Sequence, residues 1–196
     1  AEDLGSSDER FVEVYSGHPA ALTFGDRTHA SVEAMWDRAL AARLRSRPGP
    51  VLYGVACDDA HHYGGKGTAR PGRGWIMVRA RELSADAIAG AMLAGDFYAS
   101  TGVVLEKLIT NDCGMSIRVA VEPGASYRIR FVGSRREGGE AGVLLQESEG
   151  PEAYYEFRGD ELYVRGVVVS DRLHPDPTRE GEVQRAWIQP QPVTPR

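Results

Sequence analysis

Asp58, Asp59, His61 and His62 place four metal-ligating types of side chain directly after the apolar segment 51–57 (VLYGVAC). Side chains two residues apart on an extended chain point to the same side. Asp59 and His61 can therefore present a carboxylate oxygen and an imidazole nitrogen to one point, a donor set that suits Zn, Mn or Fe. The pattern predicts these two residues as ligands of a divalent transition metal. The alternative is a solvated turn in which His61 makes only a passing hydrogen bond.

Further residues of chemical interest lie close to this group or at the end of another predicted strand. Glu13 and His18 belong to or follow the segment 11–15 (FVEVY), so they are candidates for the same rim. Arg73 follows the group within a loop rich in Gly and Pro, where it could hold an anion or be solvated. Asp26 and His29 are weaker candidates in the loop that precedes the first helix.

Two helices and three strands are expected to position these residues. Alternation predicts a strand over 11–15, and an apolar run predicts a buried strand over 51–57. Ser31 is a candidate N-cap for a helix that continues to about residue 46. A strand is expected over 75–80, followed by a helix that begins after Ser84 and ends at Gly95. The order strand, helix, strand, strand, helix is typical of an α/β fold.

The second part of the chain has a different sequence pattern. From about residue 103 the segments are short, rich in β-forming residues and separated by turn signals such as Pro-Gly and Gly-Gly. Regular short strands without a helical period predict an antiparallel β-sandwich. We therefore expect two domains, a metal-binding β/α domain over residues 1–107 and a β-sandwich domain over residues 108–196.

Composition narrows the function classes. The chain has 196 residues, of which 42% are hydrophobic and 26% charged, and its formal net charge is -5. A nucleic-acid partner is not expected, because such surfaces are normally basic. No stretch approaches the roughly 18 apolar residues that span a membrane, so no membrane association is expected. Cys57 and Cys113 fit neither a CxxC zinc pattern nor a disulfide framework. The first residue is Ala rather than Met, which predicts a processed or trimmed product.

Several segments resemble the PHP (polymerase and histidinol phosphatase) family, in its stand-alone metallohydrolase branch that includes carbaryl hydrolase-like enzymes. The segment DDAH at 58–61 is similar to the family motif S-D-A-H, with Asp58 in place of Ser. EVYSGHP at 13–19 is similar to E-x-Y-N-G-H-P, with Ser16 in place of Asn. The remaining similar segments are PGRGWIMVRA, GDFYASTG and YVRGVVVSDRLHP, followed by AWIQP.

The resemblance implies an α/β fold, namely the C-terminal part of a distorted (β/α)7 barrel followed by the β-sandwich domain. It also implies a site with two or more divalent metals. Asp59 and His61 match the last metal motif, but no H-x-H, the source of the first ligands in the family, occurs in this chain. The missing ligands are then expected from a separate N-terminal half, and a homo-oligomer is the other partner expected.

The function that follows from this resemblance is a metal-dependent hydrolase of small phosphoesters or related esters, in which metal-activated water is the nucleophile. Asp59 and His61 would hold metal. His18 would orient substrate or stabilise a developing oxyanion, and Arg73 would contact an anionic group. The alternative is a non-catalytic binding module that retains a relic metal site.

Overall fold

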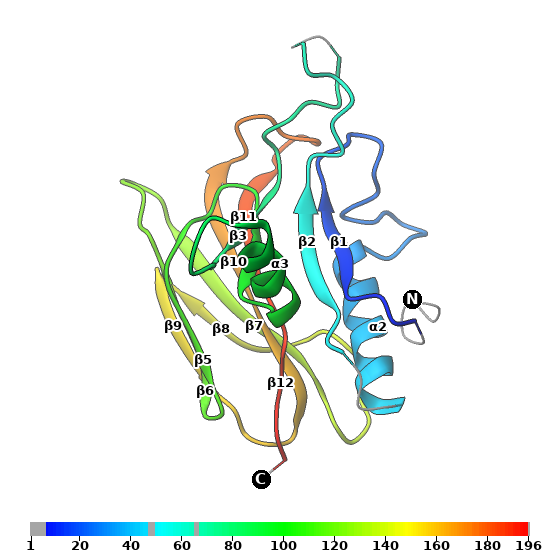
Figure 1. Ribbon diagram of the computed structural model, residues 1–196, viewed down its shortest axis with the longest axis vertical. Helices are drawn as coiled ribbons and strands as arrows, with labels where there is room; N and C mark the ends of the chain where they lie inside the picture. The colour runs from blue at the N-terminus through cyan, green and yellow to red at the C-terminus, as the bar shows by residue number, and fades with distance from the viewer. Residues whose placement is uncertain (1–6, 47–49, 65–66, 196) are drawn as a thin grey trace.

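The computed structural model describes residues 7–46, 50–64 and 67–195, which form twelve strands and two helices (Figure 1). The helices are α2 (Val32–Ser46) and α3 (Ala85–Ala94). The strands are β1 (Phe11–Ser16), β2 (Tyr53–Cys57), β3 (Trp75–Val78), β4 (Phe97–Ser100), β5 (Leu105–Asn111), β6 (Gly114–Val119), β7 (Tyr127–Arg135), β8 (Val143–Glu149), β9 (Glu152–Glu156), β10 (Glu161–Leu173), β11 (Val183–Ile188) and β12 (Gln191–Pro192).

β1, α2 and β2 form a parallel strand–helix–strand unit, as the sequence pattern predicts for residues 11–57. The side chain of Ser31 accepts a hydrogen bond from the N–H of Ala34 and so caps α2. The fully buried indole of Trp36 donates to the carbonyl of Leu52 at 2.8 Å and ties the helix to the segment that enters β2. Because β1 and β2 run in the same direction, their C-terminal ends meet at one edge.

The largest sheet has seven antiparallel strands in the order β3-β4-β11-β10-β7-β8, with β12 paired to β10. α3 connects β3 to β4. It begins at its N-cap Ser84 and ends at Gly95, whose φ of 78° is left-handed. No residue of α3 is buried, so this helix covers little of the sheet, and Figure 1 shows it standing in front of the strands.

The remaining strands form a three-stranded antiparallel sheet, β5-β6-β9, that packs on one face of the large sheet. Met115 and Ile117 of β6 share one buried cluster with Phe131, Val164 and Val168 of β7 and β10. Side chains alternate between the two faces of a strand. Val164 and Val168 therefore point to this sandwich core.

The other face of the large sheet packs against the β1–α2–β2 unit. Tyr163 and Val167 of β10 lie in a second buried cluster with Trp36, Leu40 and Trp187. β10 is thus buried on both faces over its first part, where apolar residues such as Tyr163, Val164, Val167 and Val168 point to both sides of the strand. The protein has three layers, with the large sheet in the middle (Figure 1).

A buried ion cluster joins α2 to β10. The guanidinium of Arg165 donates to both carboxylate oxygens of Asp37, at 2.8 and 2.6 Å, and to Glu33 at 2.9 Å. The hydroxyl of Tyr163 donates to Asp37 at 2.7 Å. Burial by itself would lower the pKa of Arg165, but the carboxylates of Asp37 and Glu33 outweigh it and raise that pKa.

The prediction of an α/β fold with the C-terminal part of a (β/α)7 barrel is wrong. Within the described ranges only β1 and β2 pair in parallel, and β3 and β4 pair antiparallel to each other and to β11. From β4 onward the described connections between successive strands are loops without a helix, and the paired strands run antiparallel. The fold is therefore mainly an antiparallel β structure with a single parallel strand pair. Neither of the helices that the structure describes is long and apolar enough to cross a membrane.

Candidate functional site

Three loops meet at the edge where β1 and β2 end. They are 17–31 after β1, 58–74 after β2, in which the structure describes all residues except 65 and 66, and 174–182 between β10 and β11. Figure 1 shows these loops together at the top of the molecule. We call this edge the strand-end rim. The predicted residues His18, Asp59, His61 and Arg73 all lie on its loops.

Asp58 anchors the second of these loops. Its carboxylate accepts hydrogen bonds from three consecutive backbone N–H groups, those of Gly72, Arg73 and Gly74, at 2.9, 2.7 and 2.9 Å. Oxygen atoms that accept several backbone N–H groups hold a loop in one conformation. From the sequence, Asp58 was only a neighbour of the predicted ligands Asp59 and His61. In the structure it positions the loop 58–74.

Replacing Asp58 with alanine is expected to lower the free energy of unfolding by about 1–3 kcal/mol, because three N–H groups lose a charged acceptor. Amide hydrogen exchange at Gly72, Arg73 and Gly74 should become faster while exchange in β7 and β10 does not change. Asp58→Asn keeps one carbonyl oxygen, so its free energy of unfolding should lie between those of the wild type and Asp58→Ala. Unchanged exchange in the loop of the alanine variant would contradict the anchoring role.

Arg73 is 2% exposed and links all three loops. Its guanidinium donates to the carboxylate of Asp176 at 3.0 and 3.1 Å, and to the carbonyls of Gly17 and Thr68 at 2.7 and 2.6 Å. His174, also buried, contacts the carbonyl of Arg73 through Nε2 at 2.9 Å. Contact between Arg73 and an anionic substrate stays a prediction. The partners that the structure gives this guanidinium support a role in positioning the loops.

Asp59 and His61 lie side by side on the rim. The Asp59 carboxylate is 3.8 Å from Nδ1 of His61, and both side chains are about half exposed, at 47% and 62%. Asp59 has a φ of 46°, the left-handed region, which Asp tolerates better than most residues. Nδ1 of His61 is 2.9 Å from the carbonyl oxygen of Asp59, and a carbonyl only accepts. Neutral His61 therefore carries its proton on Nδ1 and keeps a free electron pair on Nε2.

His18 has the opposite tautomer. Its Nδ1 accepts a hydrogen bond from the N–H of Ala20 at 3.1 Å, so the proton of the neutral ring lies on Nε2. The His18 and His61 rings stand edge to face with centroids 5.6 Å apart. Nδ1 of His62 likewise accepts, from Ala69 at 3.3 Å. Of these three histidines, His61 alone offers Nε2 as a metal-binding atom, whereas His18 offers a hydrogen-bond donor.

The rim also holds a thiol. Cys57 donates to the carboxylate of Glu13, across the β1–β2 pair. Burial and this carboxylate raise the pKa of the Cys57 thiol to about 12, so the group stays protonated at neutral pH and is a poor nucleophile. Among the described residues no group of three or more His, Cys, Asp or Glu side chains has an arrangement that could hold a metal ion.

The sequence missed the part of the rim that the loop 174–182 supplies. Glu182 is 3% exposed and accepts hydrogen bonds from the hydroxyl of Tyr15 at 2.8 Å and from the N–H and hydroxyl of Thr178 at 2.6 and 2.8 Å. Asp176 receives Arg73. The segment HPDPTREGE contains several acidic residues but no spacing that marks which of them turn inward.

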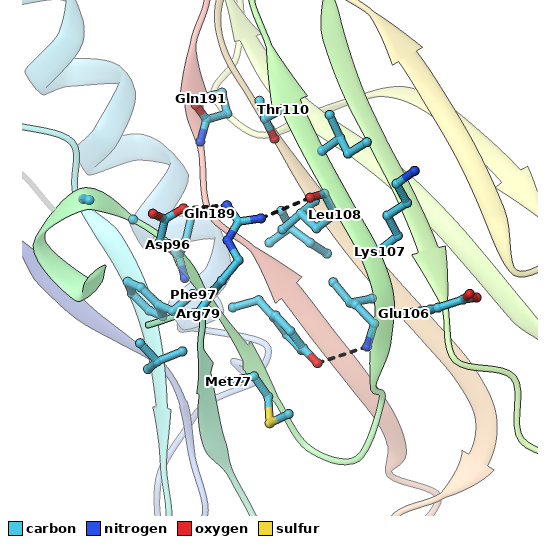
Figure 2. A pocket seen from close by; sticks show the side chains of 17 residues that line it. Met77, Arg79, Asp96, Phe97, Glu106, Lys107, Leu108, Thr110, Gln189 and Gln191 are labelled. Carbon is cyan, nitrogen blue, oxygen red and sulfur yellow. Dashed lines mark hydrogen bonds and ion pairs between the residues drawn. The ribbon is translucent and has the colours of Figure 1, made fainter. Parts of the chain in front are cut away.

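A large pocket lies elsewhere, between the end of α3, β3, β4 and the edge of β5 (Figure 2). Its volume is about 700 Å³. Arg79 crosses it, donating to Asp96 at 2.6 Å and to the carbonyl of Leu108 at 3.5 Å. The N–H of Leu105 donates to the hydroxyl of Tyr98 at 3.0 Å. The lining holds no His or Cys, and its charged side chains are Arg79, Asp96, Glu106 and Lys107.

The chain was compared with models of known protein families, with curated proteins and with solved structures, and none of these comparisons gives a match. Any functional conclusion therefore rests on the residues of the chain and their geometry.

Proposed function

We propose that the strand-end rim is part of a metal-dependent hydrolase site for small esters or phosphoesters, in which Asp59 and His61 bind a divalent ion. The observation that carries the proposal is the hydrogen bond of His61 Nδ1 to the carbonyl of Asp59. A metal-binding histidine usually donates its other ring N–H to such an acceptor, which fixes the ring and raises its basicity. The likeness of the segments DDAH and SGHP to PHP metallohydrolases supports the same proposal.

The residues fit a divalent ion in type but fall short in number. A carboxylate oxygen and an imidazole nitrogen suit Zn, Mn or Fe. A catalytic zinc takes about three protein ligands and one water. Asp59 and His61 supply two protein ligands. His18 does not add a third, because its Nδ1 accepts from Ala20 and its Nε2 carries the proton. The remaining ligands would come from water, from a second copy or from a separate polypeptide segment, so we expect weak metal binding by this chain alone.

The roles of the remaining rim residues follow from their hydrogen bonds. The ion, when bound, would supply an activated water and positive charge beside the attacked group. Nε2–H of His18 is the donor suited to an oxyanion that develops on the substrate. Asp58, Arg73 and Asp176 hold the loops in place. Arg73 acts as a positioning residue in this scheme.

The second candidate function is a non-catalytic binding module. The observation that favours it is the 700 Å³ groove beside β5, which is separate from Asp59 and His61. The two candidates differ in one measurable property, since only the hydrolase requires a metal at Asp59 and His61.

Calorimetric titration with Mn²⁺ or Zn²⁺ tests the proposal. We expect weak binding that Asp59→Asn and His61→Gln each weaken by at least about tenfold, because each removes one ligand. Asp59→Gly serves as a further variant, since glycine fits the left-handed backbone and removes only the carboxylate. His62→Gln is the matched control. Its ring accepts from Ala69 and is no ligand in the proposal, so metal affinity should not change.

Hydrolysis of p-nitrophenyl phosphate with added Mn²⁺ or Zn²⁺ then separates binding from chemistry. His18→Gln should lower kcat and leave metal affinity unchanged. Equal metal affinity in the wild type and in the Asp59 and His61 variants would contradict the proposal and favour the binding module.

A further inference from the structure

A second, smaller pocket lies where the loop 17–31, the start of α2 and the start of β11 meet. Its volume is about 200 Å³. Its lining combines two arginines with hydroxyl and aromatic side chains. The residues are Val14, Thr23, Phe24, Ser31, Glu33, Arg179, Arg185 and Trp187.

The two arginines converge on one aromatic ring. The guanidinium of Arg179 lies 3.5 Å from the centroid of Phe24, and that of Arg185 lies 5.6 Å from it. Stacking on an aromatic ring orients a guanidinium while leaving its N–H groups free at the edge. Between the described residues, no hydrogen bond or ion pair involves either guanidinium. This contrasts with Arg73 and Arg165, whose guanidinium groups bind carboxylates within the protein.

The nearby carboxylates already accept hydrogen bonds from other groups. Glu33 accepts from Arg165 and from the indole of Trp187 at 3.1 Å. Glu182 accepts from Tyr15 and Thr178. Arg185 is half-buried, and burial lowers its pKa. The positive charge of Arg179 acts in the same direction, whereas the carboxylates of Glu33 and Glu182 act against it. Among the described residues, the two guanidinium groups therefore lie close together at the pocket without a hydrogen-bond acceptor of their own.

We propose that this pocket binds a small oxyanion of the phosphate class, free or as a phosphomonoester, between the guanidinium groups of Arg179 and Arg185. Guanidinium groups bind phosphate oxygens through paired N–H donors, and two of them can hold one tetrahedral group from two sides. The hydroxyl of Ser31 accepts from Ala34, so its own hydrogen is free to donate to a ligand. The site goes beyond the proposed function, because none of its residues belongs to the metal candidates.

Thermal unfolding and tryptophan fluorescence, recorded during titration with inorganic phosphate, test this site. Ionic strength is held constant with chloride. We expect phosphate to raise the Tm and to change the emission of Trp187, which lines the pocket, and we expect chloride alone to do neither. Arg179→Gln and Arg185→Gln should each weaken the apparent phosphate affinity by about tenfold, because each removes one charged donor.

Arg81→Gln is the matched control, since Arg81 is an exposed arginine outside the pocket and its loss should not change phosphate affinity. Arg179 is itself exposed, so Arg179→Gln should fold even if the half-buried Arg185 does not tolerate replacement. An equal effect of chloride, or unchanged phosphate affinity in Arg179→Gln, would overturn the proposal. Neither result bears on the metal titration of Asp59 and His61, so the two proposals fail separately.

Discussion

Replacing Asp37 with alanine is expected to lower the free energy of unfolding by about 3–5 kcal/mol, because it leaves the buried guanidinium of Arg165 with too few acceptors. Asp37 is 3% exposed and Arg165 is 1% exposed. The same change removes the acceptor of the Tyr163 hydroxyl. These contacts join α2 to β10, so urea denaturation of the variant should show an earlier midpoint, and exchange of α2 amides should become faster.

Two controls define the origin of this effect. Glu152→Ala removes the exposed partner of Arg118 and should have little measurable effect, as is usual for surface ion pairs. The double variant Asp37→Leu/Arg165→Met should recover much of the lost stability, because it removes both charges together. An Asp37→Ala variant as stable as the wild type would show that the cluster does not hold α2 on the sheet.

Replacing Arg73 with methionine is expected to lower the free energy of unfolding by about 3 kcal/mol. The value is at the low end for a broken buried pair, because Asp176 stays partly exposed. The change also frees the loops that carry His18 and His61, so metal affinity at the rim should fall with it. The hydrogen bond from Arg73 lowers the pKa of Asp176. Burial opposes this effect, and Arg70 adds to it.

The lowered pKa of Asp176 makes the effect of Arg73→Met on stability depend on pH. A carboxylate whose pKa is depressed on folding contributes stability above its unfolded value of about 4, and the contribution is lost as pH falls through the folded value. The stability difference between the wild type and Arg73→Met should therefore be constant near neutral pH and shrink below about pH 4.

Arg70→Met is the matched control for Arg73→Met, since Arg70 also contacts Asp176 but is 43% exposed. Its loss should cost at most about 1 kcal/mol. Equal losses in the two variants would contradict the central role of Arg73.

The sequence by itself determined the local elements of this protein. Alternation, an apolar run and capping signals predicted β1, α2, β2 and α3, with Ser84 and Gly95 as the ends of α3, and the structure confirms them. These signals are local, since they depend on side-chain period and on backbone groups within a few residues. The prediction that Asp59 and His61 face one point assumed an extended chain, whereas Asp59 has a left-handed φ of 46°, and their joint metal binding stays a prediction.

The tertiary structure alone decided how the elements combine. The strand predicted over 75–80 and the helix that follows it are typical of a parallel α/β unit, yet a parallel crossover requires its helix to pack on the sheet. α3 buries no residue, and β4 returns antiparallel to β3. The partners of Arg73 are equally invisible in sequence, because Asp176 lies 103 residues away. Contacts between distant segments follow from which surfaces bury one another, and no local pattern encodes that choice.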